Sequence, residues 1–302
     1  MAYINNNKIK GLGGIKRAYL NNTLIFQSFK KNEEVVSPYD ITAKFNVTST
    51  TSKTLLCYNG SESYFTEMYV DGVQIDVASG YTFNTLGEHT VNYMLTDKTT
   101  IGNNSFSGCS NLISIVIEDS VKVVGREAFH SCKSLTEIVI PESVTNIGYY
   151  AFSSCSSLNS IVIPDSVGFI GNGCLYKCSG LTSVTIGSGV TSIGLVAFKG
   201  CTKLTSIIIP NSVEAINSSA FDNCSGLTSV TIGSGVTSIG DYAFDGCSRL
   251  TEITCLATTA PTLGTDIFVN LPSQGTLYIP HGSDYSTWLS KLPSGWTIQY
   301  LT

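Results

Sequence analysis

The segment AFKGCTKLTSIIIPNSVEAINSS, residues 197–219, is one unit of a pattern that fills the middle of the chain. Three of its positions, Phe198, Cys201 and Leu204, return every 23 residues over seven units. The leucine column is Leu112, Leu135, Leu158, Leu181, Leu204, Leu227 and Leu250, and the cysteine column is Cys109, Cys132, Cys155, Cys178, Cys201, Cys224 and Cys247. The phenylalanine column is Phe106, Phe129, Phe152, Phe198, Phe221 and Phe244, with Leu175 in its gap. Such a fixed period indicates a solenoid of stacked coils.

Each unit contains the pattern of a short strand followed by turns. In LTSVTI, residues 181–186, the first, fourth and sixth side chains point inward, and neighbouring units then pair in parallel about 4.8 Å apart. Turns follow, because a missing donor or free backbone dihedrals are tolerated there. They lie at Pro141, Pro164 and Pro210, or at Gly187 and Gly233. A second apolar pair such as Val190 and Ile193 comes next, and the Ala-Phe-x-x-Cys stretch is expected to close the coil as a short helical turn.

The ten cysteines follow the repeat rather than a metal motif. A uniform column is expected to be a buried ladder of free thiols, because repeated small, weakly polar side chains fill a core without pairing. An occasional disulfide or metal site is the alternative. No C-x-x-C pair with zinc spacing is present, so no metal site is assigned. Cys57 and Cys255 lie outside the ladder, and Cys174 takes the alanine position beside Leu175.

Segments on both sides of the repeat lack its period. Residues 38–97 alternate apolar and polar side chains, with a hairpin signal at Asp71-Gly72, and predict a small antiparallel β-sandwich that caps the first coil. Residues 1–37 predict a β-arm with a hairpin at Asn21-Asn22, followed by a linker. The repeats then occupy 98–255, and 256–302 form a degenerate last repeat and an aromatic C-terminal cap.

Composition excludes several classes of partner. The net charge of -5 argues against nucleic acid, because phosphate binding needs clustered Lys and Arg. No apolar run reaches the roughly 18 residues that a membrane span needs. The first residues also lack the basic and apolar regions of a secretion signal.

The repeat unit, with its Ala-Phe-x-x-Cys signature and its Ile-Pro turn, resembles the BspA-like (treponemal-type) leucine-rich repeats over about residues 98–280. The segment from Gly87 to Tyr93 is similar to the last strand pair of small bacterial immunoglobulin-like modules. We therefore expect a mostly β chain: a right-handed leucine-rich-repeat solenoid with parallel strands and short helical turns, preceded by the small sandwich. The resemblance implies an extracellular or cell-surface protein that adheres to host or bacterial proteins or glycans, without catalytic residues.

Catalysis finds no support among the residue patterns. The three histidines, His89, His130 and His281, have no Cys or carboxylate partner at motif spacing, and no phosphate-binding loop is present. We therefore predict no enzyme and no cofactor.

Trp288 and Trp296 are expected to cap the last coil, with a polysaccharide-stacking platform as the alternative.

The concave strand face is the predicted binding surface, because the third and fifth strand positions of each unit point outward. Its candidate residues are Val116, Glu137, Val139, Val162, Thr185, Ile208, Thr231 and Glu252. A bacterial surface adhesin is the favoured function, and a structural or host-recognition component of a prophage particle is the alternative. A purely structural interpretation also exists, since β-branched side chains stack well along a parallel sheet.

Overall fold

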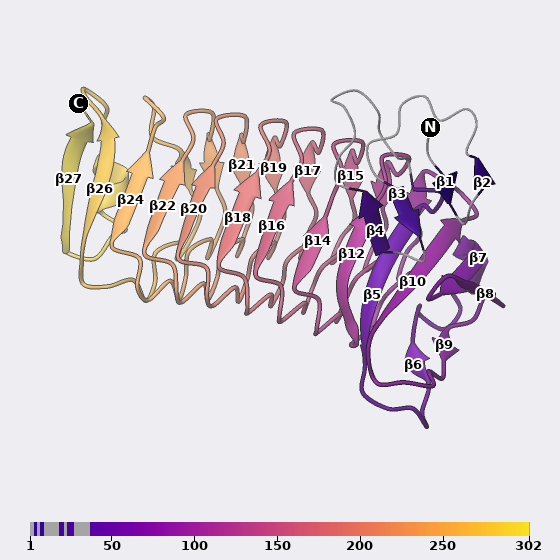
Figure 1. The fold of residues 1–302 in the computed structure, drawn as a ribbon. Helices are drawn as coiled ribbons and strands as arrows, with labels where there is room; N and C mark the ends of the chain where they lie inside the picture. Colours follow the sequence, from indigo (N-terminus) through magenta and orange to yellow (C-terminus); the bar gives the residue numbers. More distant parts are fainter. Residues whose placement is uncertain (1–2, 5–6, 9–17, 21–22, 27–36, 302) are drawn as a thin grey trace.

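The structure is a computed structural model that describes residues 3–4, 7–8, 18–20, 23–26 and 37–301. The repeats form flat coils stacked in one direction, and an antiparallel sheet lies at their N-terminal end (Figure 1). Each coil contributes one strand to a front sheet and one to a back sheet, so the mostly β solenoid of parallel strands is confirmed.

The front strands carry the Leu-x-x-Ile-x-Ile pattern, and the back strands carry the second apolar pair. The front strands are β12 (Leu112–Ile117), β14 (Glu137–Val139), β16 (Ser160–Ile163), β18 (Ser183–Ile186), β20 (Ser206–Ile209), β22 (Ser229–Ile232), β24 (Glu252–Cys255), β26 (Gln274–Pro280) and β27 (Gly295–Leu301). The back sheet consists of β11 (Thr100–Ile101), β13 (Val123–Val124), β15 (Asn146–Ile147), β17 (Phe169–Ile170), β19 (Ser192–Ile193), β21 (Ala215–Ile216), β23 (Ser238–Ile239) and β25 (Thr262–Leu263). The back sheet is continuous, whereas front-strand pairing is interrupted between β14 and β16 and between β18 and β20.

The three repeated columns form the core between the two sheets. Consecutive phenylalanine rings stack nearly parallel, with centroids 5.3 Å apart for Phe106 and Phe129 and 5.0 Å apart for Phe198 and Phe221. All ten cysteines are buried and free. A ladder thiol donates to the phenylalanine carbonyl of the preceding coil, as Cys132 Sγ does to Phe106 O at 3.1 Å. The thiol ladder predicted from the repeat is therefore present.

The Ala-Phe-x-x-Cys segment is not the helical turn that the sequence predicted. Alternate N–H groups donate to the next coil, from Glu127 to Tyr149 O, from Phe129 to Ala151 O and from Ser131 to Ser153 O, at 2.7 to 2.9 Å. Glu127 and Ser131 adopt positive φ to allow this. The segment thus bonds between coils rather than within itself. Among the described residues, only η1 (Glu62–Tyr64) and α1 (Ser286–Leu289) are helical.

The glycines that follow the front strands are required by close approach rather than by unusual dihedrals. A Cβ at Gly187 would lie 2.4 Å from Pro164 O of the preceding coil, and one at Gly233 would lie 2.4 Å from Pro210 O. At Gly187 and Gly233 glycine is therefore required because the carbonyl of the proline in the preceding coil occupies the space that a side chain would need.

The N-terminal segment builds one sheet that continues the front sheet. It contributes β5 (Ile41–Val47), β7 (Phe65–Val70), β8 (Val73–Ile75) and β10 (Gly87–Leu95) to this sheet, whereas β6 (Thr54–Leu55) and β9 (Gly80–Tyr81) form a separate two-stranded sheet. The sheet order is β14-β12-β5-β10-β7-β8, and β5 pairs antiparallel with β12 of the first coil. The expected sandwich is only partly seen, since the second layer is the short pair β6 and β9. The hairpin at Asp71-Gly72 is confirmed by the pairing of Val70 with Val73.

Aromatic residues close both ends of the solenoid. Phe65 and Tyr93 contact Phe106 of the first coil, at centroid distances of 5.7 and 5.2 Å. At the far end Trp288 and Trp296 are 0% and 5% exposed, and their indole N–H groups donate to Pro261 O and Pro272 O at 3.0 Å. The polysaccharide platform predicted as an alternative at these tryptophans is wrong, because both indole rings are buried.

Two antiparallel strand pairs precede these modules: β1 (Tyr3–Ile4) with β2 (Asn7–Lys8), and β3 (Ala18–Leu20) with β4 (Thr23–Phe26). The second pair is the hairpin predicted around residues 21–22. The turn itself and the predicted linker lie outside the described residues.

Candidate functional site

The front sheet presents a row of exposed aliphatic side chains where the sequence predicted it. We call this the front row; it comprises the fifth strand position of each coil. Val116, Val139, Val162 and Ile208 are 42%, 49%, 56% and 69% exposed. Their neighbours along each strand, such as Ile161 and Ile163, are buried, because alternate side chains of a strand point to opposite faces. Four β-branched apolar side chains therefore face solvent on an otherwise polar sheet.

The remaining predicted residues lie on the same face. Glu137, Thr185 and Glu252 are exposed, whereas Thr231 is only half-exposed. Strand register aligns the members of the front row across neighbouring coils, pairing Val116 with Val139, Val162 with Thr185 and Ile208 with Thr231. The structure therefore brings the predicted residues onto one surface, divided by the two interruptions of the sheet.

Two further members of the front row were missed by sequence reasoning. Thr254 pairs with Tyr278 of β26, which places a half-exposed tyrosine in the row. This spacing is 24 residues rather than 23, so the period that located the other residues misses it. At the opposite end Val116 pairs with Thr42 of β5, because the N-terminal sheet continues the front sheet.

Threonines at the start of front strands tie consecutive coils together. Thr136, Thr182 and Thr228 each place their hydroxyl 3.0 Å from a carbonyl oxygen of the preceding coil. The same carbonyl accepts the threonine N–H in each case. These three hydroxyls are bonded within the scaffold, so the exposed groups available for contact on the face are its aliphatic row, Glu137, Glu252 and the exposed hydroxyls of the third and fifth strand positions, such as Thr185.

One histidine has a carboxylate partner that the sequence did not predict. His89 Nδ1 lies 2.6 Å from Asp71 Oδ2, and its Nε2 lies 3.1 Å from both the hydroxyl and the carbonyl oxygen of Thr85. The ring also packs against Phe83 at 4.5 Å. The pair was missed because the β7–β8 hairpin, not sequence spacing, brings Asp71 to β10. The Thr85 hydroxyl beside the His89–Asp71 pair resembles a hydrolase triad. His89 also contacts the Thr85 carbonyl oxygen and packs against Phe83, so we interpret the pair as a structural contact that holds residues 82–86 in place.

The other titratable groups are part of the scaffold. Burial raises the pKa of the ladder thiols, for example Cys109, Cys155 and Cys178, so their nucleophilic thiolate form is disfavoured. Burial also raises the pKa of Cys57 to about 11.

Within the described residues, no three His, Cys, Asp or Glu side chains are grouped to hold a metal ion. The described helices are too short or too polar to cross a bilayer.

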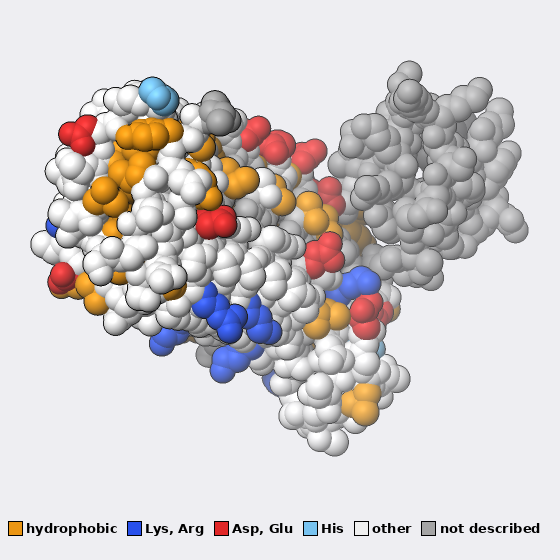
Figure 2. Space-filling model, turned by 90° about the vertical axis from the view of Figure 1, so that its left-hand side faces the viewer, with side chains coloured by type: hydrophobic (Ala, Val, Ile, Leu, Met, Phe, Trp, Pro, Cys, Tyr) orange, Lys and Arg blue, Asp and Glu red, His pale blue; other side chains and the backbone are white. Residues whose placement is uncertain are grey.

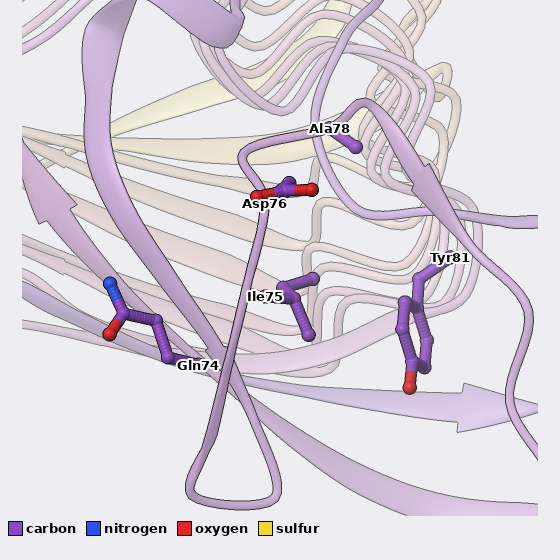
Figure 3. A pocket seen from close by; sticks show the side chains of 5 residues that line it. All are labelled: Gln74, Ile75, Asp76, Ala78 and Tyr81. Carbon is purple, nitrogen blue, oxygen red and sulfur yellow. The ribbon is translucent and has the colours of Figure 1, made fainter.

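A shallow hollow lies beside the outer strand of the N-terminal sheet. It is lined by Gln74, Ile75, Asp76, Ala78 and Tyr81, with Ile75 and Tyr81 on opposite sides (Figure 3). The hollow is open to solvent and is remote from the front row in the sheet order. Its apolar side chains, Ile75, Ala78 and Tyr81, do not enclose a space in which a ligand would be buried.

Together the coils, the ladders and the exposed strand face define a leucine-rich-repeat solenoid. The model of the BspA type leucine-rich repeat region matches six copies, over residues 99–227 and 170–286. The chain belongs to this BspA-type leucine-rich-repeat family. No curated protein matches the chain.

Several solved structures resemble the chain. A leucine-rich-repeat protein of Treponema pallidum is 32% identical with a TM-score of 0.53, and the match covers 57% of this chain and 82% of that protein. A leucine-rich cell surface protein of Faecalibacterium prausnitzii is 24% identical with a TM-score of 0.35, covering 68% and 78%. The pneumococcal vaccine antigen PcpA is 18% identical with a TM-score of 0.41, covering 68% and 66%.

Proposed function

We propose that this chain is a non-catalytic binding module that acts outside the cell as an adhesin. It contacts a protein or glycan on a host or bacterial surface through the front row. The observation that carries the proposal is the exposure of Val162 and Ile208, at 56% and 69%, on the front face of the stacked coils. Exposed apolar side chains gathered on one face are typical of interaction surfaces.

The chemistry of the front row suits weak contacts repeated along a surface. Val116, Val139, Val162 and Ile208 offer apolar area, but Tyr278 is the row's large aromatic side chain. Strong hot spots are usually Trp, Tyr or Arg in desolvated pockets. Affinity would therefore come from many copies of the module engaging a repetitive surface together. Membership of the BspA-type family supports this assignment.

Arginine substitutions test the surface. In a surface plasmon resonance screen of purified host matrix proteins and immobilised glycans, Val162→Arg and Ile208→Arg should each weaken capture by about tenfold or more, because a charge enters an apolar contact. Leu195→Arg is the matched control, since Leu195 is 45% exposed but lies outside the front row. Equal capture by the wild type and both front-row variants would refute this use of the front face.

Location is tested separately on cells of the source organism. Protease shaving of intact cells, followed by mass spectrometry, should release peptides of this chain. Peptides that appear only after lysis or in purified phage particles would contradict the adhesin assignment and favour a prophage component.

A further inference from the structure

Charge is segregated around the solenoid although the chain is acidic overall. Basic side chains occur in the turns that precede the front strands, between the phenylalanine and leucine columns. They are Lys133, Lys177, Lys199, Lys203 and Arg249. Most acidic side chains of the coils lie elsewhere, for example in the turns at the other end of the front strands, at Glu118, Asp119, Glu142 and Asp165, and the acidic exceptions among the basic turns are Asp222 and Asp245. Figure 2 shows Lys and Arg gathered along one side of the solenoid, with most Asp and Glu elsewhere.

Four of these basic groups are not neutralised by a neighbour. Lys199 forms an ion pair with Asp222 at 2.6 Å. Lys133, Lys177, Lys203 and Arg249 are exposed and make no ion pair with any described residue. We call these four residues the basic strip. Because its charges are uncompensated within salt-bridge distance, the strip attracts anions despite the net charge of -5.

The repeat fixes the spacing of the strip. Stacked rings show that successive coils lie 5.0 to 5.4 Å apart. Lys133 and Arg249 belong to coils five repeats apart, so the strip extends about 25 Å along the solenoid. Four charges over this length correspond to one charge every 6 to 8 Å or so. Double-stranded DNA carries one charge per roughly 1.7 Å, which is far denser than the strip can match.

Aromatic rings are held beside the middle of the strip. Lys177 Nζ lies 5.1 Å from the centre of the Tyr176 ring, and Tyr150 packs edge-on against Tyr176 with centroids 6.4 Å apart. The Tyr150 ring lies against Gly173, where a Cβ would meet it at 2.1 Å. The absence of a side chain at Gly173 therefore leaves room for the Tyr150 ring to lie over the next coil. Cys174 and Leu175, where this coil departs from the repeat, directly follow Gly173 in the sequence.

We propose that the basic strip and the Tyr150–Tyr176 pair bind an anionic polysaccharide, a sugar chain that carries sulfate or carboxylate groups. Such chains are linear, and their anionic groups are separated by sugar units, so successive groups can reach successive basic side chains of the strip. Lysine and arginine contact the anionic groups, and the tyrosine rings contact the apolar faces of the sugars. This site is separate from the front row and does not depend on the proposed function.

The test compares defined oligosaccharides by isothermal titration at low salt. A heparin-derived octasaccharide carries sulfate and carboxylate, a hyaluronan octasaccharide carries carboxylate alone, and dextran is uncharged. We expect the first to bind, dextran not to bind, and affinity to fall by about tenfold or more as NaCl rises from about 50 to about 300 mM. Hyaluronan binding as tight as that of the heparin fragment would assign recognition to carboxylates, and weaker binding would assign it to sulfates.

Charge-matched variants locate the site. The quadruple variant Lys133→Gln, Lys177→Gln, Lys203→Gln and Arg249→Gln should lose binding of the heparin fragment by about tenfold or more. The control Lys53→Gln, Lys98→Gln, Lys122→Gln and Lys291→Gln removes the same charge from exposed residues outside the strip and should stay within about twofold. Tyr176→Leu should lower affinity while leaving the salt dependence unchanged.

Four outcomes would overturn the proposal. Three of them are failure of both the heparin fragment and hyaluronan to bind, binding of the strip variant equal to that of the wild type, and a loss of affinity in the control as large as that in the strip variant. Tighter binding of an oligouridine than of the heparin fragment would instead identify a single-stranded nucleic-acid site. Circular dichroism of every variant verifies that the fold is retained.

Discussion

At the residue scale, each coil has two positions with positive φ, and the N–H groups of these residues donate hydrogen bonds to carbonyl oxygens of the next coil. The residue before the repeated alanine is one of them: it is Glu127, Tyr150, Gly173, Val196 and Ser219 in successive coils, with φ between 50° and 61°. A left-handed conformation is costly for a β-branched residue. Val196, with φ of 50°, is therefore the most strained member of this column.

Val196→Asn should stabilise the protein by about 1 kcal/mol, because asparagine tolerates the left-handed region. Asn104 already occupies the same column. The measurement is the free energy of unfolding in urea. Val123→Asn is the control: Val123 is half-buried on β13 without positive φ, and its substitution should destabilise. Destabilisation by Val196→Asn would show that burial of the valine outweighs its backbone strain.

At the element scale, one coil exchanges two core residues without breaking the stack. Cys174 replaces the repeated alanine and Leu175 replaces the phenylalanine, and both are fully buried. Cysteine is larger than the alanine it replaces and leucine is smaller than the phenylalanine it replaces, so the total side-chain volume is nearly kept. Volume-conserving exchanges are the kind that cores tolerate.

Restoring the consensus in two steps tests this compensation. Leu175→Phe alone should cost about 1 to 3 kcal/mol through overpacking, and Cys174→Ala alone should cost about 1 kcal/mol through a small cavity. The double variant should cost less than the sum, because phenylalanine then fills the space that the cysteine leaves. Urea unfolding of all four proteins gives the coupling energy, and additive costs would mean that the two sites are independent.

At the scale of the whole molecule, one sheet joins the N-terminal segment to the repeats. Strand β5 lies between β10 and β12, with Ala43 opposite both Val91 and Ile115. Ala43→Pro should cost about 3 kcal/mol or more, because proline cannot continue a central strand. Hydrogen exchange should then increase together in β10 and β12 and remain unchanged in β26.

Gln74→Pro is the control for this substitution, since β8 is the outer strand of the sheet, where proline is tolerated. Increased exchange in β10 alone, with β12 still protected, would show that the N-terminal segment and the solenoid unfold independently.

Buried thiols along the solenoid predict alkaline unfolding of the whole molecule. Burial raises the pKa of Cys109, Cys132, Cys155, Cys178 and Cys201 above the value of about 8.5 that an unfolded thiol has. Their contribution to stability is therefore complete below that value and is lost as the pH rises above it. Each thiol removes about 1.4 kcal/mol per pH unit in this range.

The measurement is urea unfolding under reducing conditions between about pH 8 and about pH 10.5. The free energy of unfolding should fall steeply above about pH 9, and Cys155→Ala should reduce the slope. A free energy that stays constant over this range would contradict protonated, buried thiols in the folded state.

The sequence by itself determined the solenoid, its core and the exposed position of the front row. A 23-residue period repeats the same local choice of inward and outward side chains, so one unit describes all the others. Burial of Phe198, Cys201 and Leu204 follows from that period, and so does the exposure of Val162 and Ile208.

Only the tertiary structure decided which distant segments meet. The pairing of β5 with β12, the contact of Asp71 with His89 and the place of Tyr278 in the front row all depend on partners outside the period. No single column of the sequence groups Lys133, Lys177 and Lys203, because each occupies a different position of its own repeat, and the stacking of the coils brings the turns that carry them together along the solenoid. Local periodicity specifies which way a side chain points, whereas contacts between non-repeating segments are set by the packing of the whole chain.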